Sequence, residues 1–187
     1  RAVVTRVTAR HRALQAANVH TATLHLGDIS YSEGFDVTWA LFMNMIEPAA
    51  TMAPYMVVQG NHERDWGNSG SYFDGGDSWG ECGVAVAQRF PLPSGERSTT
   101  HDYYSFVYGE IKMVMVNSEL SLLAGSPQLE WLEKELASVN RTETPFLVVG
   151  AHRPVYSVYR GPLADFLEPL LLTAGADLVL AGHVHDA

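Results

Sequence analysis

The sequence is poor in cysteine, in positive charge and in long apolar runs, and each shortage excludes a class of protein. Cys82 is its only cysteine, so no internal disulfide can form and a metal would have to use histidine and oxygen ligands. Twelve Lys+Arg against 21 Asp+Glu give a net charge of -9, which argues against a surface for nucleic acid or anionic membranes. Apolar runs such as 113–116 and 170–172 fall far below the ~20 residues of a membrane helix.

What is present is the composition of a globular domain. Apolar residues make up 47% of the 187 residues and charged residues 18%, which fits one packed domain over residues 1–187. Periodicity predicts helices over 3–17, 36–48, 126–136 and 163–172, and strands over 21–26, 55–58, 103–108, 111–116, 146–149 and 177–181. We expect Asp36 to cap the second helix and Pro169 to kink or interrupt the last. This alternation indicates an α/β fold with a parallel or mixed sheet flanked by helices.

Residues 64–100 form the longest stretch without clear periodicity. They hold glycine, serine, aspartate and proline between two predicted strands. Because an insert of this length in a compact domain is usually functional, we expect it to flank an active site.

Four of the predicted strands end in residues of the types that bind metal ions. The segments at these ends read GDISY at 27–31, GNHE at 60–63, GAHRP at 150–154 and GHVH at 182–185. In such sheets ligands bind at the carboxyl ends of the strands, and glycine lets the backbone turn sharply beside the ligand. His183 and His185 share one face if their segment is extended. The four endings together predict a metal site.

Each of these residues alone has a more ordinary interpretation. Asp28 and Asn61 could be turn residues, and Asp28 could also be a helix cap. His152 could be a buried histidine with a hydrogen-bond partner, and Tyr31 could be an ordinary loop aromatic. Their joint occurrence, in this order and at strand ends, favours the metal site.

The ordered motifs GDISY, GNHE, AHRP and GHVH resemble those of the calcineurin-like metallophosphoesterases. Tyr31, three residues after Asp28, resembles the purple acid phosphatase branch. The longer segments LHLGDISYSEG, GNHERDW, DSWGECGV and GHVHDA are similar to plant and protist purple acid phosphatases, which include nucleotide pyrophosphatase/phosphodiesterase-like members. The resemblance implies a four-layer α/β/β/α sandwich. We expect it to be incomplete at both ends, a partial catalytic domain, because the family's first aspartate motif should precede the first helix and the family continues past residue 187.

The resemblance also implies a binuclear metal centre. Asp28 would bridge the two ions, and Tyr31, as phenolate, and His185 would bind a ferric ion. The second ion would be divalent, either zinc, manganese or ferrous iron. Its ligands would be Asn61, His152 and His183.

The residues that would act on the substrate follow from the same resemblance. His62 would face the phosphate and donate a hydrogen bond or a proton to the leaving oxygen, so Asp28 and His62 are the candidate catalytic residues. Arg153 or Arg160 could bind a phosphate oxygen, the alternative for each being a solvated surface arginine.

The implied activity is hydrolysis of phosphate monoesters, small phosphodiesters or nucleotides by a water that two metals activate, with an acidic pH optimum. One alternative is a non-catalytic remnant of this fold that acts as a binding module, and another is a metal-dependent nuclease of the same superfamily. The acidic charge argues against nucleic acid as a partner. Asn140-Arg141-Thr142 fits an N-glycosylation acceptor, and we expect a secreted, extracellular or vacuolar-lysosomal glycoprotein. The sequence leaves the ester, the divalent metal and the oligomeric state open.

Overall fold

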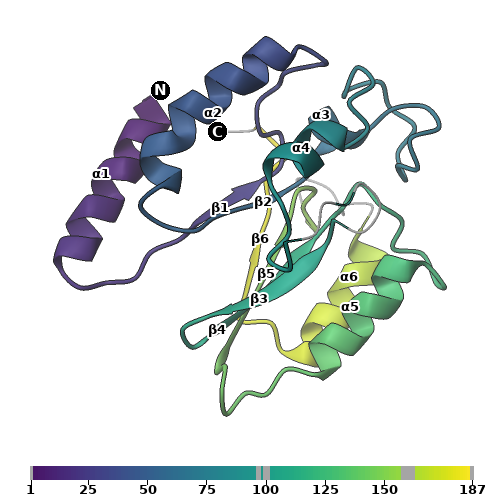
Figure 1. The fold of residues 1–187 in the computed structure, drawn as a ribbon. Coiled ribbons are helices and arrows are strands. Elements are labelled where there is room, and N and C mark those ends of the chain that lie inside the picture. The colour runs from purple at the N-terminus through teal and green to yellow at the C-terminus, as the bar shows by residue number, and fades with distance from the viewer. Residues whose placement is uncertain (1, 96–97, 99–101, 157–162, 186–187) are drawn as a thin grey trace.

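The computed structural model describes residues 2–95, 98, 102–156 and 163–185, and it shows two sheets between two pairs of helices (Figure 1). One sheet is parallel and two-stranded, with β1 (Thr23–Leu26) beside β2 (Tyr55–Val58). The other has four strands in the order β3-β4-β5-β6. These strands are β3 (Tyr104–Tyr108), β4 (Ile111–Val116), β5 (Phe146–Ala151) and β6 (Leu178–Leu180). Only β3 and β4 pair antiparallel, so the sheet is mixed, as predicted.

Each sheet carries one pair of helices on its outer side (Figure 1). The helices beside the two-stranded sheet are α1 (Ala2–Ala16) and α2 (Asp36–Ala50). The helices beside the four-stranded sheet are α5 (Pro127–Ala137) and α6 (Ala164–Ala174). The expected α/β architecture with flanking helices is therefore confirmed. Among the residues the structure describes, no helix is long and apolar enough to cross a bilayer.

Two apolar clusters hold the layers together. The larger joins alternate residues of β4 and β5 to one stripe each of α5 and α6, because period-two strand faces meet helix residues spaced by four. Its members include Val114, Val116, Leu147, Val149, Leu132, Leu136, Leu167 and Leu171. The smaller packs α2 against β2, the short helix α4 (Val84–Arg89) and the loop after β1. Its buried members are Ile29, Trp39, Phe42, Ile46, Val57 and Val86.

The cap of α2 and the course of α6 differ from the predictions. Phe35 occupies the N-cap position of α2, and Asp36 is the first helical residue, with its carboxylate paired to Arg89. Pro169 lies inside α6, and the helix continues through it to Ala174. A proline removes one backbone hydrogen bond from a helix. The buried stripe of α6 on the four-stranded sheet outweighs that loss.

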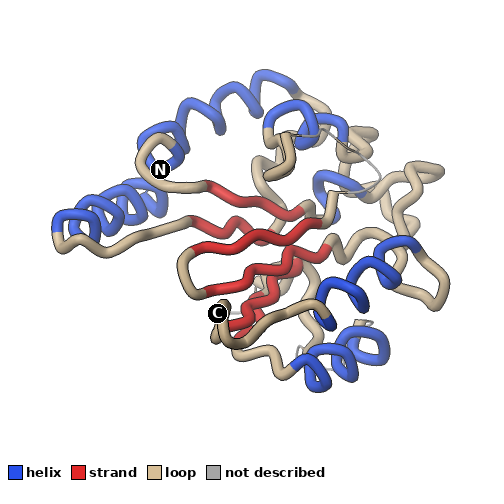
Figure 2. Tube along the Cα trace, turned by 60° about the horizontal axis from the view of Figure 1, so that its bottom comes forward, coloured by secondary structure: helices blue, strands red, loops and turns tan. Residues whose placement is uncertain are grey.

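The region over 64–100 contains a helix that periodicity does not predict, α4 (Val84–Arg89), and it follows the equally unpredicted short helix α3 (Asn61–Arg64). Glu81 fixes this region to the two-stranded layer, because its carboxylate accepts hydrogen bonds from Gly34 N and Trp39 Nε1. Figure 2 shows the strands of both sheets lying side by side, with the long loops and short helices gathered at one end.

Candidate metal centre

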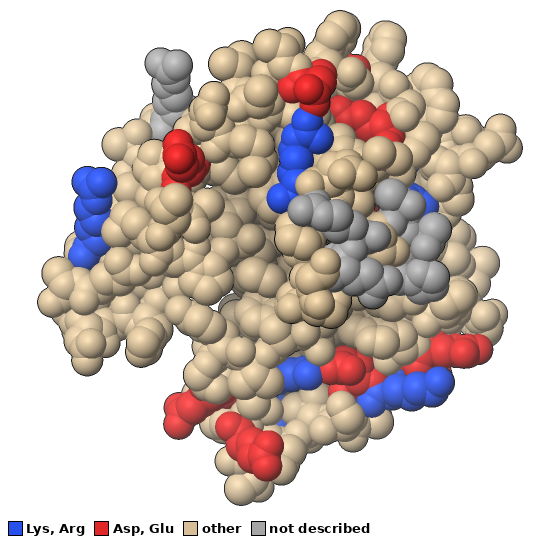
Figure 3. Space-filling view, viewed as in Figure 1, with Lys and Arg blue, Asp and Glu red and all other residues tan. Residues whose placement is uncertain are grey.

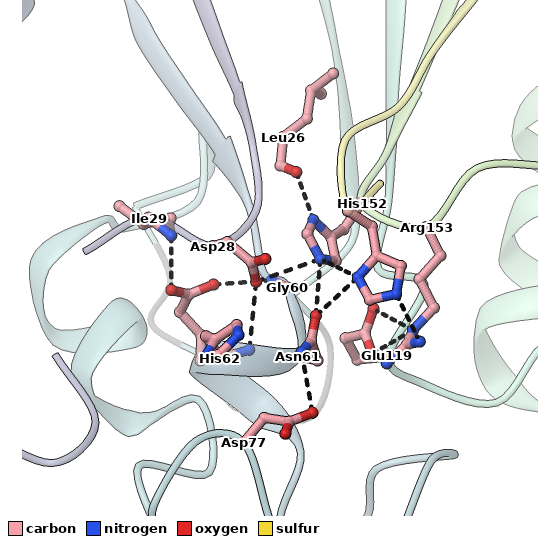
Figure 4. Close-up of polar contacts among 12 residues, drawn as sticks. Leu26, Asp28, Ile29, Gly60, Asn61, His62, Asp77, Glu119, His152 and Arg153 are labelled. Atoms are coloured by element: carbon pink, nitrogen blue, oxygen red, sulfur yellow. Dashed lines mark hydrogen bonds and ion pairs between the residues drawn. The ribbon is translucent and has the colours of Figure 1, made fainter. Parts of the chain in front are cut away.

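The predicted metal ligands lie at or just beyond the carboxyl ends of strands. Asp28 comes two residues after β1, Asn61 opens α3 after β2, and His152 directly follows β5 (Figure 4). His183 and His185 come after β6. The fold therefore collects ligands from four separate chain segments at one place, as strand ends of an α/β structure do.

Three residues in these segments have unfavourable backbone conformations that the surrounding packing must stabilise. Asp28, Tyr31 and His183 have φ angles of 50°, 50° and 66°, in the left-handed region that residues other than glycine rarely adopt. Such conformations concentrate at functional sites, where the surrounding structure holds them. Gly27 is required for the same approach, since a Cβ at this position would lie 2.4 Å from His152 Nδ1. The tight turn after β1 thus brings Asp28 against His152.

Four atoms converge into what we call the inner donor group: Asp28 Oδ1, Asn61 Oδ1, His152 Nε2 and His183 Nδ1. His152 Nε2 lies 3.3 Å from Asp28 Oδ1, 3.0 Å from Asn61 Oδ1 and 3.1 Å from His183 Nδ1. His183 Nδ1 lies 3.0 Å from Asn61 Oδ1. Asp28, His152 and His183 each offer a ligand atom, and these atoms lie within 4.8 Å of one another. The spacing suits ligands around one cation.

The outward contacts of His152 and Asn61 show that their inner atoms are electron-pair donors. His152 Nδ1 lies 2.7 Å from the Leu26 carbonyl, which can only accept, so Nδ1 carries the ring proton and Nε2 keeps its lone pair. Asn61 donates from Nδ2 to Asp77 Oδ2 at 3.0 Å, which leaves Oδ1 facing inward. Burial lowers the pKa of His152 to about 4, against the opposing effect of Asp28, so Nε2 is unprotonated at neutral pH. His152 Nε2 therefore faces the oxygens of Asn61 and Asp28 without a proton between them, which fits a bound metal ion.

A second set, the outer donor group, uses the other oxygen of the same carboxylate: Asp28 Oδ2, Tyr31 Oη and His185 Nε2. Tyr31 Oη donates to Asp28 Oδ2 at 3.1 Å and lies 3.2 Å from His185 Nε2. Burial and the negative charge of Asp28 raise the pKa of Tyr31 to about 12, so the phenol is protonated without a cation beside it. A multivalent cation held here would reverse these local electrostatics and favour the phenolate. Asp28 therefore stands between two possible metal positions.

The match to known proteins agrees with this geometry. Residues 6–187 match the family model described as calcineurin-like phosphoesterase. The chain belongs to the calcineurin-like phosphoesterase family. Family membership implies a binuclear metal site, and Asp28, His152 and His183 are residues that could hold a metal ion there.

The chain is also similar to purple acid phosphatases, as its motifs predicted. "Probable inactive purple acid phosphatase 9" of Arabidopsis thaliana is 38% identical over 184 residues, covering 86% of this chain and 28% of the relative. A "Nucleotide pyrophosphatase/phosphodiesterase" of Hordeum vulgare is 33% identical over 186 residues, covering 94% of this chain and 50% of the relative. Purple acid phosphatase PPD1 from yellow lupin (Lupinus luteus) seeds superposes with a TM-score of 0.85 at 34% identity, over 96% of this chain and 33% of that structure. This phosphoesterase chain thus spans about 28% of the length of the first curated relatives.

Of the residues expected to contact substrate, His62 lies beside the outer donor group and Arg153 beside the inner donor group. His62 donates from its backbone N to Asp28 Oδ1 at 3.3 Å, and its ring centroid lies 4.5 Å from that of Tyr31. Its Nδ1 is 4.0 Å from Glu33 Oε1. Arg160 lies outside the described residues. The substrate roles of His62, Arg153 and Arg160 stay predictions.

The structure adds a residue that sequence reasoning did not single out. Glu63 is 1% exposed and accepts hydrogen bonds from Ile29 N at 2.7 Å and Gly60 N at 2.9 Å, which ties the loops after β1 and β2 together. Burial raises the pKa of Glu63 to about 7. A signal for it exists: a glutamate three residues after an N-cap position, as Glu63 is after Gly60, is the pattern of a capping box.

Proposed function

We propose that this chain forms the metal-binding part of an acid phosphatase that hydrolyses phosphate monoesters, small phosphodiesters or nucleotides. The observation that carries the proposal is the shared carboxylate, because Asp28 Oδ1 belongs to the inner donor group and Oδ2 to the outer. We assign a divalent ion, zinc, manganese or ferrous iron, to the inner donor group and a ferric ion to the outer. When bound, such a pair would lower the pKa of a water, offset phosphate charge and orient an in-line attack.

The chain's own residues have three tasks in this reaction. Asp28 would hold both metal ions, since its two oxygens face different donor groups. The packed backbone around Gly27 and Glu63 keeps the donors in place. His62 lies next to Tyr31 at the outer donor group, where its ring can donate a hydrogen bond or a proton to the leaving oxygen.

We expect the substrate to be a small ester, because the surface does not favour a polyanion. The net charge is -9, and Figure 3 shows basic and acidic side chains scattered over the face in view without a broad basic patch. A phosphate is then attracted by local cations at the site rather than by the overall surface. Asn140 is exposed and follows α5, as an N-glycosylation acceptor would be. A secreted or vacuolar-lysosomal location remains part of the proposal.

A second candidate is a binding module of the same fold that does not catalyse hydrolysis. It is favoured by the names of four relatives from Arabidopsis thaliana, each called a probable inactive purple acid phosphatase. The inner donor group would serve such a module as a structural metal site. Metal content and turnover therefore have to be measured separately.

The decisive experiment measures metals and hydrolysis on the same purified, unsupplemented protein. Elemental analysis should give about two metals per chain, one of them iron, and assays on p-nitrophenyl phosphate, its bis-ester and nucleotides should show turnover that a chelator removes. One metal without turnover would support the binding module. No metal above trace would contradict both assignments.

A further inference from the structure

A cavity of about 440 Å³ lies beside the edge of β2. Its walls come from β2, α4, the segment 90–93 and one face of β3. Among the described residues that line it, none belongs to the inner or the outer donor group. Its volume falls in the range of ~300–1,000 Å³ that is typical of small-molecule sites. The cavity is therefore large enough for a small ring compound and separate from the candidate metal centre.

Aromatic rings form much of the wall. The rings of Tyr55 and Phe90 are stacked at 23°, with centroids 6.3 Å apart. The rings of Tyr104 and Phe106 are stacked at 27°, with centroids 6.2 Å apart. The hydroxyls of both tyrosines already have hydrogen-bond partners in a neighbouring strand. The rings thus offer carbon surfaces to the cavity, which favour a flat and largely apolar ligand.

Gln59 adds a primary amide to this apolar wall. The residue is 2% exposed, and neither its Oε1 nor its Nε2 has a hydrogen-bond partner among the described residues. Leaving a buried amide unpaired is unfavourable, and nearly all buried polar groups in folded proteins have a partner. A glutamine amide presents an acceptor and a donor side by side. A ligand with the complementary edge, a donor beside an acceptor, would pair with both atoms.

The charge beside the cavity limits the ligand further. Asp102 also lines it and is 6% exposed. Within the described part of the chain, no lysine, arginine or histidine lines the cavity. A phosphate or carboxylate would therefore meet a negative charge without a positive one to offset it. An uncharged ligand fits this surface.

We propose that this cavity binds an uncharged aromatic carboxamide or lactam, with its ring against the aromatic wall and its amide edge paired with Gln59. The proposal goes beyond the function proposed above and does not rest on it, because no metal ligand takes part.

The first test compares three ligands of similar shape on the wild-type protein, using titrations followed by ligand-detected NMR. Benzamide should bind saturably. Benzoate, which carries a charge, and N,N-dimethylbenzamide, which cannot donate a hydrogen bond, should each bind about tenfold more weakly or worse. Inorganic phosphate should leave benzamide binding unchanged. Absence of benzamide binding, equal binding of the three ligands, or displacement by phosphate would each overturn the proposal.

The second test replaces Gln59 by leucine, which keeps the bulk and removes the amide. We expect benzamide affinity to fall by about tenfold and the affinity for fluorobenzene, which has no amide, to stay unchanged. Gln88→Leu is the matched control, since Gln88 is an exposed glutamine on α4 outside the cavity lining, and it should bind both probes like the wild type. Circular dichroism melting checks that each variant folds.

A third variant fills the cavity instead of changing its polarity. Ala87 is 6% exposed and lines the cavity, so Ala87→Phe should abolish binding of both probes. A folded Ala87→Phe that still binds benzamide would place the site elsewhere, and Gln59→Leu with undiminished benzamide affinity would disprove the amide pair. If neither variant folds, the ligand series on the wild type decides. None of these outcomes bears on the proposed phosphatase function, which metal content and turnover test.

Discussion

The inner and outer donor groups share one carboxylate but differ in how they are built. In the inner group, Asn61 is 6% exposed and His152 1% exposed, and further contacts to Asp77 and Leu26 hold both side chains. In the outer group, Tyr31 is 42% exposed, and the contacts described for its hydroxyl are to Asp28 and His185 themselves.

This difference predicts an order of metal binding. Asn61 and His152 are already oriented, and His152 Nε2 is unprotonated at neutral pH, so an ion that binds them requires little further ordering of side chains. The outer group has to order an exposed side chain and remove a proton from a phenol whose pKa is raised to about 12. We therefore expect metal-depleted protein to refill the inner group first. Variants that remove ligands of one group show whether the inner metal binds without the outer one.

The largest effect should come from Asp28→Asn, because Asp28 is the only residue that belongs to both groups. We expect both metals to be lost and hydrolysis to fall by about 1000-fold or more, equivalent to ~4 kcal/mol of transition-state stabilisation. Elemental analysis and steady-state kinetics measure the two effects. Asp36→Asn, an exposed aspartate at the start of α2, is the control for folding and handling. Turnover retained in Asp28→Asn would disprove the shared-carboxylate assignment.

His183 and His185 lie two residues apart but belong to different donor groups, so replacing each one tests one group at a time. His183→Ala should empty the inner group, and His185→Ala should empty the outer group and leave the inner metal bound. Metal content should fall from about two to about one in His185→Ala, and activity should fall by about 100-fold or ~2.7 kcal/mol in either variant. Loss of both metals in His185→Ala would show that the inner group does not hold an ion by itself.

Tyr31→Phe should have a smaller effect, because it removes one ligand and leaves Asp28 and His185 in place. A phenolate bound to ferric iron absorbs visible light, and we expect this absorption to disappear. Activity should fall by about tenfold, or ~1.4 kcal/mol. The metal that the inner group holds should be unchanged by elemental analysis. A visible band that persists in Tyr31→Phe would place the iron elsewhere.

The sequence predicted that the residues of the inner donor group lie together because they carry a local signal, whereas Tyr31 was expected at the metal only from the family resemblance. Asp28, Asn61, His152 and His183 each stand one or two residues after a glycine or at a strand end, and parallel strands end on one side of a sheet. The alternation of helices and strands likewise predicted the layers, because burial on one face imposes a period on each element.

The supporting contacts could not be predicted, because they join residues that are far apart in the chain and lack a pattern. Arg153 meets Glu119 and Asp65, which are 34 and 88 residues away in the sequence. The sequence alone does not distinguish an arginine that neutralises buried carboxylates from an arginine on the surface. The uninterrupted course of α6 through Pro169 has a related reason, since tertiary packing overrides the local preference of proline.

The smallest effect should come from Asp177→Asn, a change remote from both donor groups that tests whether their metals respond to a general loss of stability. Hydrogen bonding from Leu147 N at 2.7 Å and then from Arg141 at 2.6 Å lowers the pKa of Asp177 below its usual value. The folded state therefore binds fewer protons than the unfolded state, so this contribution is present above pH ~4 and disappears as the pH falls through the lowered pKa. We expect Asp177→Asn to lower Tm by about 2 °C at pH 7, less at pH 3, with both metals retained. If Asp177→Asn loses metal from either group, then the metal loss measured in the ligand variants reflects reduced stability rather than a missing ligand.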